Sequence, residues 1–166
     1  MSPYLQVPLL FAVAILQATV IPHLAIWEVF ADLPLLVVIS WSLIRGRREG
    51  IVWGFVAGLA VDLFSGAPFG AATLSLMVAG FLAGAGAATV FRTHILLPLV
   101  TTFAVTIVYD LLFLLVVQIF GGTVEWFDSL WRIILPSAVL NTCLTPVVYG
   151  LARLLYGRFS QAEMEL

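Results

Sequence analysis

The chain has 166 residues, of which 63% are hydrophobic and 10% are charged, and its formal net charge is −2. Soluble domains carry about 25% charged residues, so this composition indicates an integral membrane protein with room for about six spans of roughly 20 residues. The acidic balance argues against a nucleic-acid partner, and a lone cysteine, Cys143, excludes a disulfide framework. We therefore expect residues 1–166 to form a single all-α transmembrane domain with six transmembrane helices.

The predicted spans lie at residues 4–21, 33–45, 49–65, 69–91, 95–120 and 130–156. The N-terminus lacks the basic start of a cleaved signal peptide, so the first span is expected to stay in the mature protein. The second and third spans are short, and tilt, local thinning or burial against neighbours must help them to cross the membrane.

Arginine sets the predicted orientation, since the chain has no lysine. With six spans, the loops after spans two and four share one side of the membrane with the C-terminal end. Arg132 is the exception among the seven arginines. The six that fall on that side are Arg45, Arg47, Arg48, Arg92, Arg153 and Arg158. The opposite loops carry Trp27, Glu28, Asp32, Glu125, Trp126 and Asp128. The positive-inside rule then places both termini in the cytoplasm.

Glycines recur every four residues around the third span, at positions 46, 50, 54 and 58, and again at 66 and 70, while Asp62 takes the place between. Residues four apart share a helix face, and small residues let membrane helices approach closely. We predict a helix-docking surface, with an internal helix, a partner's span and a second copy of this chain as alternative occupants. Its residues are Gly50, Gly54, Phe55, Gly58, Gly66 and Gly70.

Polar residues within the spans are predicted to lie at similar depth. At 1.5 Å per residue, Gln17, Asp62 and Asp110 each lie about 20 Å from the cytoplasmic end of their span, and Arg132 lies at the outer mouth of span six. A shared cluster in which Arg132 is the counter-ion would offset the cost of intramembrane charge. Asn141 lies near mid-membrane and is expected to hydrogen-bond another helix. The cluster is either a structural polar knot or a site for a ligand, a proton or a partner helix.

Motifs for catalysis are absent from the sequence, which has no HExxH, CxxC, P-loop or GxSxG pattern. Asp62 and Asp110 lack the local motifs expected around an intramembrane aspartyl protease dyad. We therefore expect no enzyme activity, no cofactor and no metal.

The run from Trp53 to Gly70 resembles the signature of the MreD family of rod shape-determining membrane proteins. The matching skeleton is Gly-Phe-x-x-Gly-Leu-x-x-Asp, followed after a short gap by Pro-x-Gly. A second match in span six joins Arg132, Pro136, Asn141 and Pro146. One departure stands at the entry to span two, where Asp32-Leu33-Pro34 replaces the expected proline followed by a polar residue.

This resemblance implies a non-enzymatic scaffold of the bacterial cell-elongation complex in the cytoplasmic (inner) membrane, acting in cell shape and peptidoglycan synthesis. The implied partners are MreC most directly, RodA and a class B penicillin-binding transpeptidase alongside, MreB indirectly, and membrane lipid; self-association is left open. The family's fold resembles the substrate-binding subunits of energy-coupling-factor transporters. The alternative function is therefore a small-molecule, vitamin-type binding subunit of a transporter, with a pocket open to the outside.

Overall fold

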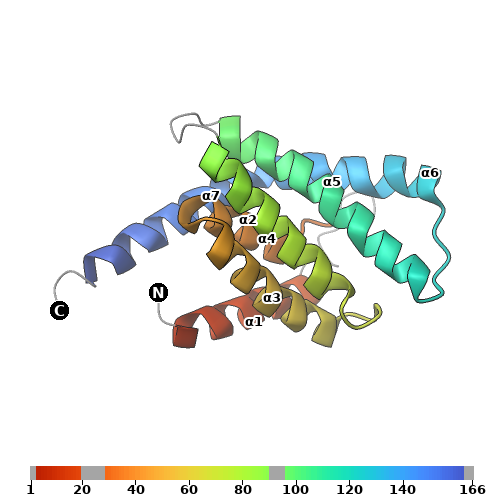
Figure 1. The fold of residues 1–166 in the computed structure, drawn as a ribbon, viewed down its shortest axis with the longest axis horizontal. Coiled ribbons are helices and arrows are strands. Elements are labelled where there is room, and N and C mark those ends of the chain that lie inside the picture. The colour runs from red at the N-terminus through yellow and green to blue at the C-terminus, as the bar shows by residue number, and fades with distance from the viewer. Residues whose placement is uncertain (1–2, 20–28, 90–95, 163–166) are drawn as a thin grey trace.

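The computed structural model describes residues 3–19, 29–89 and 96–162, and these residues are almost entirely helical (Figure 1). The helices are α1 (Pro3–Thr19), α2 (Leu33–Arg45), α3 (Arg47–Phe64), α4 (Ala71–Thr89), α5 (Leu96–Ile119), and a last continuous helix made of α6 (Trp126–Ser129), the π-helical turn η2 (Leu130–Ile134) and α7 (Leu135–Ala162). The start of α1 and the end of α7 lie at the same end of the bundle. Trp27, Glu28 and Arg92 lie outside the described residues.

Three of the described helices are long and apolar enough to cross a membrane: residues 71–88 of α4, residues 96–119 of α5, and the continuous helix over residues 126–158. Helices α1 and α2 are apolar but have only 17 and 13 residues. Helix α3 carries charged residues near both ends. It begins with Arg47, Arg48 and Glu49, and Asp62 lies two residues before its last residue, Phe64. Whether α1, α2 and α3 also span the membrane is therefore still a prediction.

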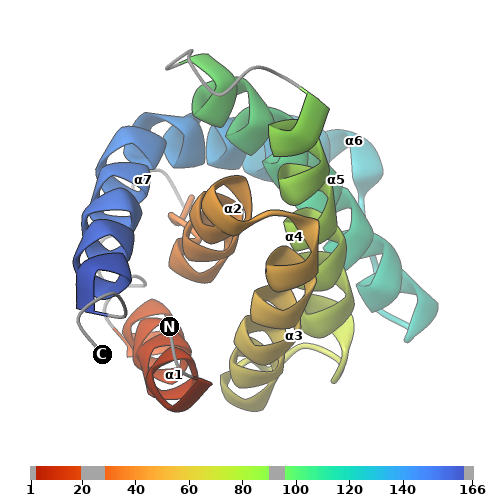
Figure 2. The same ribbon diagram turned by 60° about the vertical axis from the view of Figure 1, so that its left-hand side comes forward.

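Helix α2 occupies the centre of the bundle, with α1, α3, α4, α5 and α7 around it (Figure 2). A helix that is apolar on every face is stable only when it is surrounded, and most of the length of α2 is buried, including Leu35, Leu36 and Ile39. The short second apolar segment is thus enclosed by protein rather than lipid. The surrounding helices therefore cover the apolar surface of this short helix.

Helices α3 and α4 pack face to face along glycines. A Cβ atom built on Gly54 would collide with the backbone of Leu76, and one on Gly58 would collide with the backbone of Thr73. Gly50 likewise meets Gly80 of α4. Because these collisions are with backbone atoms, side-chain rotation cannot relieve them. The glycines of α3 therefore form an internal docking surface, and this surface is occupied by α4.

Three members of the predicted docking surface lie elsewhere. Gly66 and Gly70 follow the end of α3 at Phe64, and neither has an atom within 4 Å of a built Cβ. Gly70 has φ of 100°, a turn conformation that glycine tolerates best. Phe55 points away from α4 and is 47% exposed. The four-residue spacing of glycines continues beyond Phe64 in the sequence, but α3 ends there, so Gly66 and Gly70 do not share a helix face with Gly54 and Gly58.

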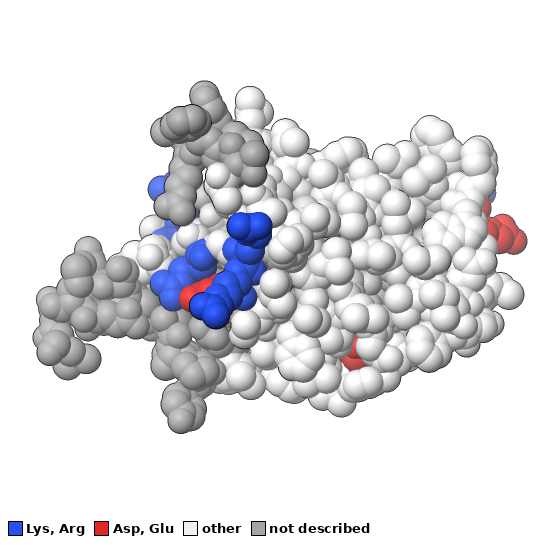
Figure 3. Space-filling model, viewed as in Figure 1, with Lys and Arg blue, Asp and Glu red and all other residues white. Residues whose placement is uncertain are grey.

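Charged side chains gather at the two ends of the molecule on the face shown in Figure 3, with a broad and nearly uncharged belt between them. The arginine-rich end holds the turn from α2 to α3, where Arg45 pairs with Glu49 at 2.8 Å. Trp41 stacks on Trp53 with ring centroids 4.6 Å apart, and its indole N–H donates to Glu49. This end of the central helix is therefore locked by aromatic and ionic contacts.

Candidate functional site

The N-terminus of α2 is the most unusual point of the fold, because α2 is enclosed by the other helices and begins inside the bundle. Its N-cap residue, Asp32, and its first residue, Leu33, are only partly exposed. The first N–H groups of a helix have no partner within it. Where neighbouring helices exclude water, these N–H groups must find a partner in the protein.

Side chains from three helical elements satisfy these donors. The Gln17 side-chain carbonyl on α1 accepts from the N–H of Leu33 at 3.0 Å, and the Asn141 side-chain carbonyl on α7 accepts from the N–H of Asp32 at 3.0 Å. The Asp32 carboxylate accepts from the N–H of Leu35 at 3.0 Å, as an N-cap residue does. The second helical position is Pro34, which has no N–H to satisfy. Every N–H of the first turn is therefore accounted for.

Asp62 performs a similar role for α4. Its carboxylate accepts hydrogen bonds from the N–H groups of Gly70, Ala72 and Thr73, each at 3.0 Å, and from the Thr73 hydroxyl at 2.5 Å. A carboxylate at a helix N-terminus also interacts favourably with the helix dipole. Asp62 thus fastens the end of α3 to the start of α4, and its charge is stabilised by backbone donors rather than by a cation.

A second set of polar groups, from α5 and α7, faces Asp32. The Tyr109 side chain and the Asp110 carboxyl lie close enough to Asp32 to interact with it, and the Asp110 carboxyl also interacts with Ser137. Two buried atoms in this region have no partner among the described residues, namely Oδ2 of Asp110 and Nδ2 of Asn141. We call the whole set the polar layer, and its members are Gln17, Asp32, Asp62, Tyr109, Asp110, Ser137 and Asn141.

Arg132 is not part of the polar layer, so its predicted role as counter-ion to Asp62 or Asp110 is wrong. Its guanidinium pairs with Asp128 one turn earlier, with Nε 2.7 Å from the carboxylate, and 78% of the Arg132 side chain is exposed. Equal depth did not bring the residues together, because Arg132 points outward from η2. The other predicted members, Gln17, Asp62, Asp110 and Asn141, all contribute to the polar layer, although Asp62 bonds the start of α4 rather than its fellow members.

Sequence reasoning missed Asp32, Tyr109, Ser137 and Thr73 as members or partners of the layer. A signal existed for Asp32, because an aspartate two positions before a proline is typical of a helix N-cap with proline in the first turn. Tyr109 and Ser137 offered no comparable signal, since their role depends on which side of the helix meets α2. Among the described residues, no group of three or more histidine, cysteine or acidic side chains could hold a metal ion.

A bundle of apolar helices surrounds a buried central helix, and Gln17, Asn141 and Asp62 bind the N–H groups at the starts of two helices. This arrangement is that of a helical membrane protein. The chain belongs to the MreD family: the family model described as rod shape-determining protein MreD matches residues 1–155. This is a family of membrane proteins that determine rod shape. Comparison with curated proteins and with solved structures gives no match.

Proposed function

We propose that this chain is a non-enzymatic scaffold of the rod complex that binds the single membrane span of MreC and so influences peptidoglycan synthesis. The family match over residues 1–155 supports the role in rod shape. RodA, a class B penicillin-binding transpeptidase and, indirectly, MreB are proposed as further partners. We place the protein in the bacterial cytoplasmic membrane with six spans and both termini inside, as the arginine distribution favours.

The observation that carries MreC binding is the orientation of Phe55 within the family motif. Gly54, Gly58 and Asp62 of that motif contact α4, so the fold itself uses them. Phe55 is different, because it lies on the outer face of α3 and is 47% exposed. A residue of the signature that the internal packing does not use is the best candidate for contact with a partner.

The outer face of α3 fits a partner helix in shape and chemistry. Val52 and Leu63 share this face with Phe55, and they are 52% and 58% exposed. The three positions lie three and eight residues apart, a spacing that keeps them on one stripe of a helix. The stripe is apolar throughout, as the contact of one membrane span with another requires.

Co-purification from membranes tests this proposal. Phe55→Ala is expected to reduce the recovery of MreC with the tagged protein, and the matched control Phe103→Ala, an exposed phenylalanine of α5, is expected to leave recovery unchanged. Both variants should keep the melting profile of the parent. Equal recovery from Phe55→Ala and the parent would exclude this face as the MreC site, whereas a loss of self-association alone would assign it to a second copy.

Reporter fusions test the orientation. A fusion after Gln161 is expected to report a cytoplasmic location, and one at Glu125 an external location. An external reading at Gln161 would contradict the six-span topology.

No observation favours the alternative of a vitamin-type binding subunit. That function needs a pocket at the outer end of the bundle. A pocket among the described residues lies at the arginine-rich end, which the proposed orientation places on the cytoplasmic side.

A further inference from the structure

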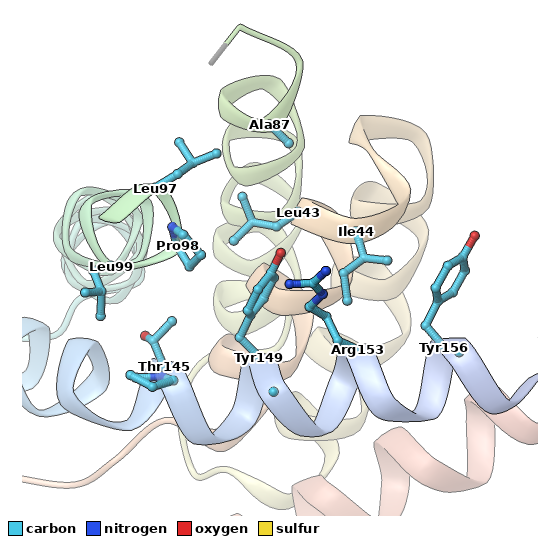
Figure 4. A pocket seen from close by; sticks show the side chains of 13 residues that line it. Leu43, Ile44, Ala87, Leu97, Pro98, Leu99, Thr145, Tyr149, Arg153 and Tyr156 are labelled. Carbon is cyan, nitrogen blue, oxygen red and sulfur yellow. The ribbon is translucent and has the colours of Figure 1, made fainter. Parts of the chain in front are cut away.

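A groove opens at the arginine-rich end of the molecule, between the start of α5, the end of α2 and the second half of α7 (Figure 4). Its volume is about 640 Å³. Leu43 and Leu97 form part of its walls, and Pro146 lies on its α7 side. These groups are apolar, so part of the groove wall suits hydrocarbon, while other parts of the lining are polar.

Polar groups enter the groove from one face of α7. Tyr149, Arg153 and Tyr156 are spaced by four and three residues, which places them on one stripe of a helix, and all three line the groove. The Arg153 guanidinium lies 5.9 Å from the centre of the Tyr149 ring. Tyr149 and Arg153 therefore lie against each other in the groove, whereas Tyr156 lies at its edge, beside Arg45.

The charge of Arg153 is not compensated within the described part of the chain. Arg45 nearby is different, because Glu49 binds it at 2.8 Å while its guanidinium lies 5.5 Å from the Tyr156 ring centre. The ion pairs of the described residues join Arg45 to Glu49 and Arg132 to Asp128, so no carboxylate faces Arg153. The groove thus combines a partly apolar wall with a guanidinium that forms no ion pair among the described residues.

We propose that this groove binds one anionic phospholipid. The phosphate would accept hydrogen bonds from Arg153, whose planar guanidinium suits bidentate contact with phosphate, and the acyl chains would lie along Leu43, Leu97 and Pro146. The assignment of a lipid rests on the proposed orientation, which places the groove on the cytoplasmic side, where basic pockets between membrane helices suit anionic headgroups. A soluble anion would match the arginine but would leave the apolar walls unfilled.

Native mass spectrometry of the detergent-purified protein tests this proposal, with phosphatidylglycerol compared with phosphatidylcholine of the same chains. The parent is expected to retain phosphatidylglycerol with about tenfold preference, corresponding to one charge-assisted contact. Arg153→Gln should abolish the preference. The matched control Arg158→Gln should keep it, because Arg158 lies on the same helix but does not line the groove.

A second variant separates the groove from the charge. Gly150 lines the groove, and a Cβ built there meets no atom within 4 Å, so Gly150→Leu should fold normally and fill the space that the acyl chains need. It is expected to reduce binding of both lipids at an unchanged melting temperature.

Three results would overturn the proposal. The first is equal retention of the two lipids by the parent, and the second is equal behaviour of Arg153→Gln and Arg158→Gln. The third is displacement of the lipid by millimolar inorganic phosphate, which would assign the site to a free anion. These readings do not depend on MreC, so they stand apart from the outcome for Phe55.

Discussion

Replacing the Asp62 carboxylate gives the sharpest test of the role assigned to it. Asp62→Ala removes the acceptor of four hydrogen bonds at the start of α4. Asp62→Asn keeps the shape but retains one acceptor oxygen. Because three of the four donors converge on Oδ2, the asparagine oxygen should turn to that side, leaving its NH₂ group against the N–H of Ala72.

The geometry sets the size of the two effects. A hydrogen bond to a charged group contributes about 1.5–3 kcal/mol, but the bonds to a single carboxylate are not additive, and loss of an N-cap side chain costs about 0.5–2 kcal/mol. Since Asp62 is only 4% exposed, water replaces little of what is lost. We expect about 3 kcal/mol of destabilisation for Asp62→Ala and about 1 kcal/mol for Asp62→Asn.

Thermal unfolding in detergent, followed by the fraction of monodisperse protein, measures both variants against Asp128→Ala. Asp128 is exposed and paired with Arg132, so its replacement should cost at most about 1 kcal/mol. The double variant of Asp62→Ala with Arg132→Leu should be additive, because the two residues share no partner. Equal stability of Asp62→Ala and Asp128→Ala, or strong coupling of Asp62 with Arg132, would refute the capping role.

Two further predictions concern the packing. Gly54→Leu should lower the melting temperature strongly and reduce stability by about 3 kcal/mol or more, because its Cβ would meet the backbone of α4. The control is Gly86→Ala, whose Cβ would lie 3.6 Å from Thr101. Equal stability of the two variants would exclude backbone contact between α3 and α4. Asn141→Leu should reduce stability by about 2 kcal/mol, because the N–H of Asp32 would then have no acceptor. The control is Val139→Leu, a change at a neighbouring exposed position, which should have no effect. An unchanged melting temperature for Asn141→Leu would show that water or another group caps α2.

Most of the helices could be predicted from the sequence, because they are apolar runs closed by glycine, proline or charge. The short segment at 33–45 was predicted near its observed bounds, and the glycine rhythm correctly indicated close packing. Its occupant was left open, because a row of glycines shows that something approaches closely without showing what. Only the backbone of Leu76 and Thr73 across the interface answers that question.

The polar contacts were less accessible for a geometric reason. Counting residues along a helix gives the height of a side chain, but it does not give its direction around the axis relative to the neighbouring helices. Asp62 and Arg132 were placed at similar heights, yet one turns to the start of α4 and the other to solvent. Gln17 and Asn141 reach the start of α2 because their faces happen to point inward.

The cap on the central helix has a consequence for biosynthesis. The bond from the Asp32 N–H to Asn141 joins positions 109 residues apart, so it cannot form until Asn141 of the last helix has left the ribosome. Gln17 and the Asp32 carboxylate, which bind the next N–H groups of α2, are synthesised much earlier. The N–H of Asp32 therefore lacks this acceptor during most of synthesis, and a chain truncated before residue 141 never acquires it.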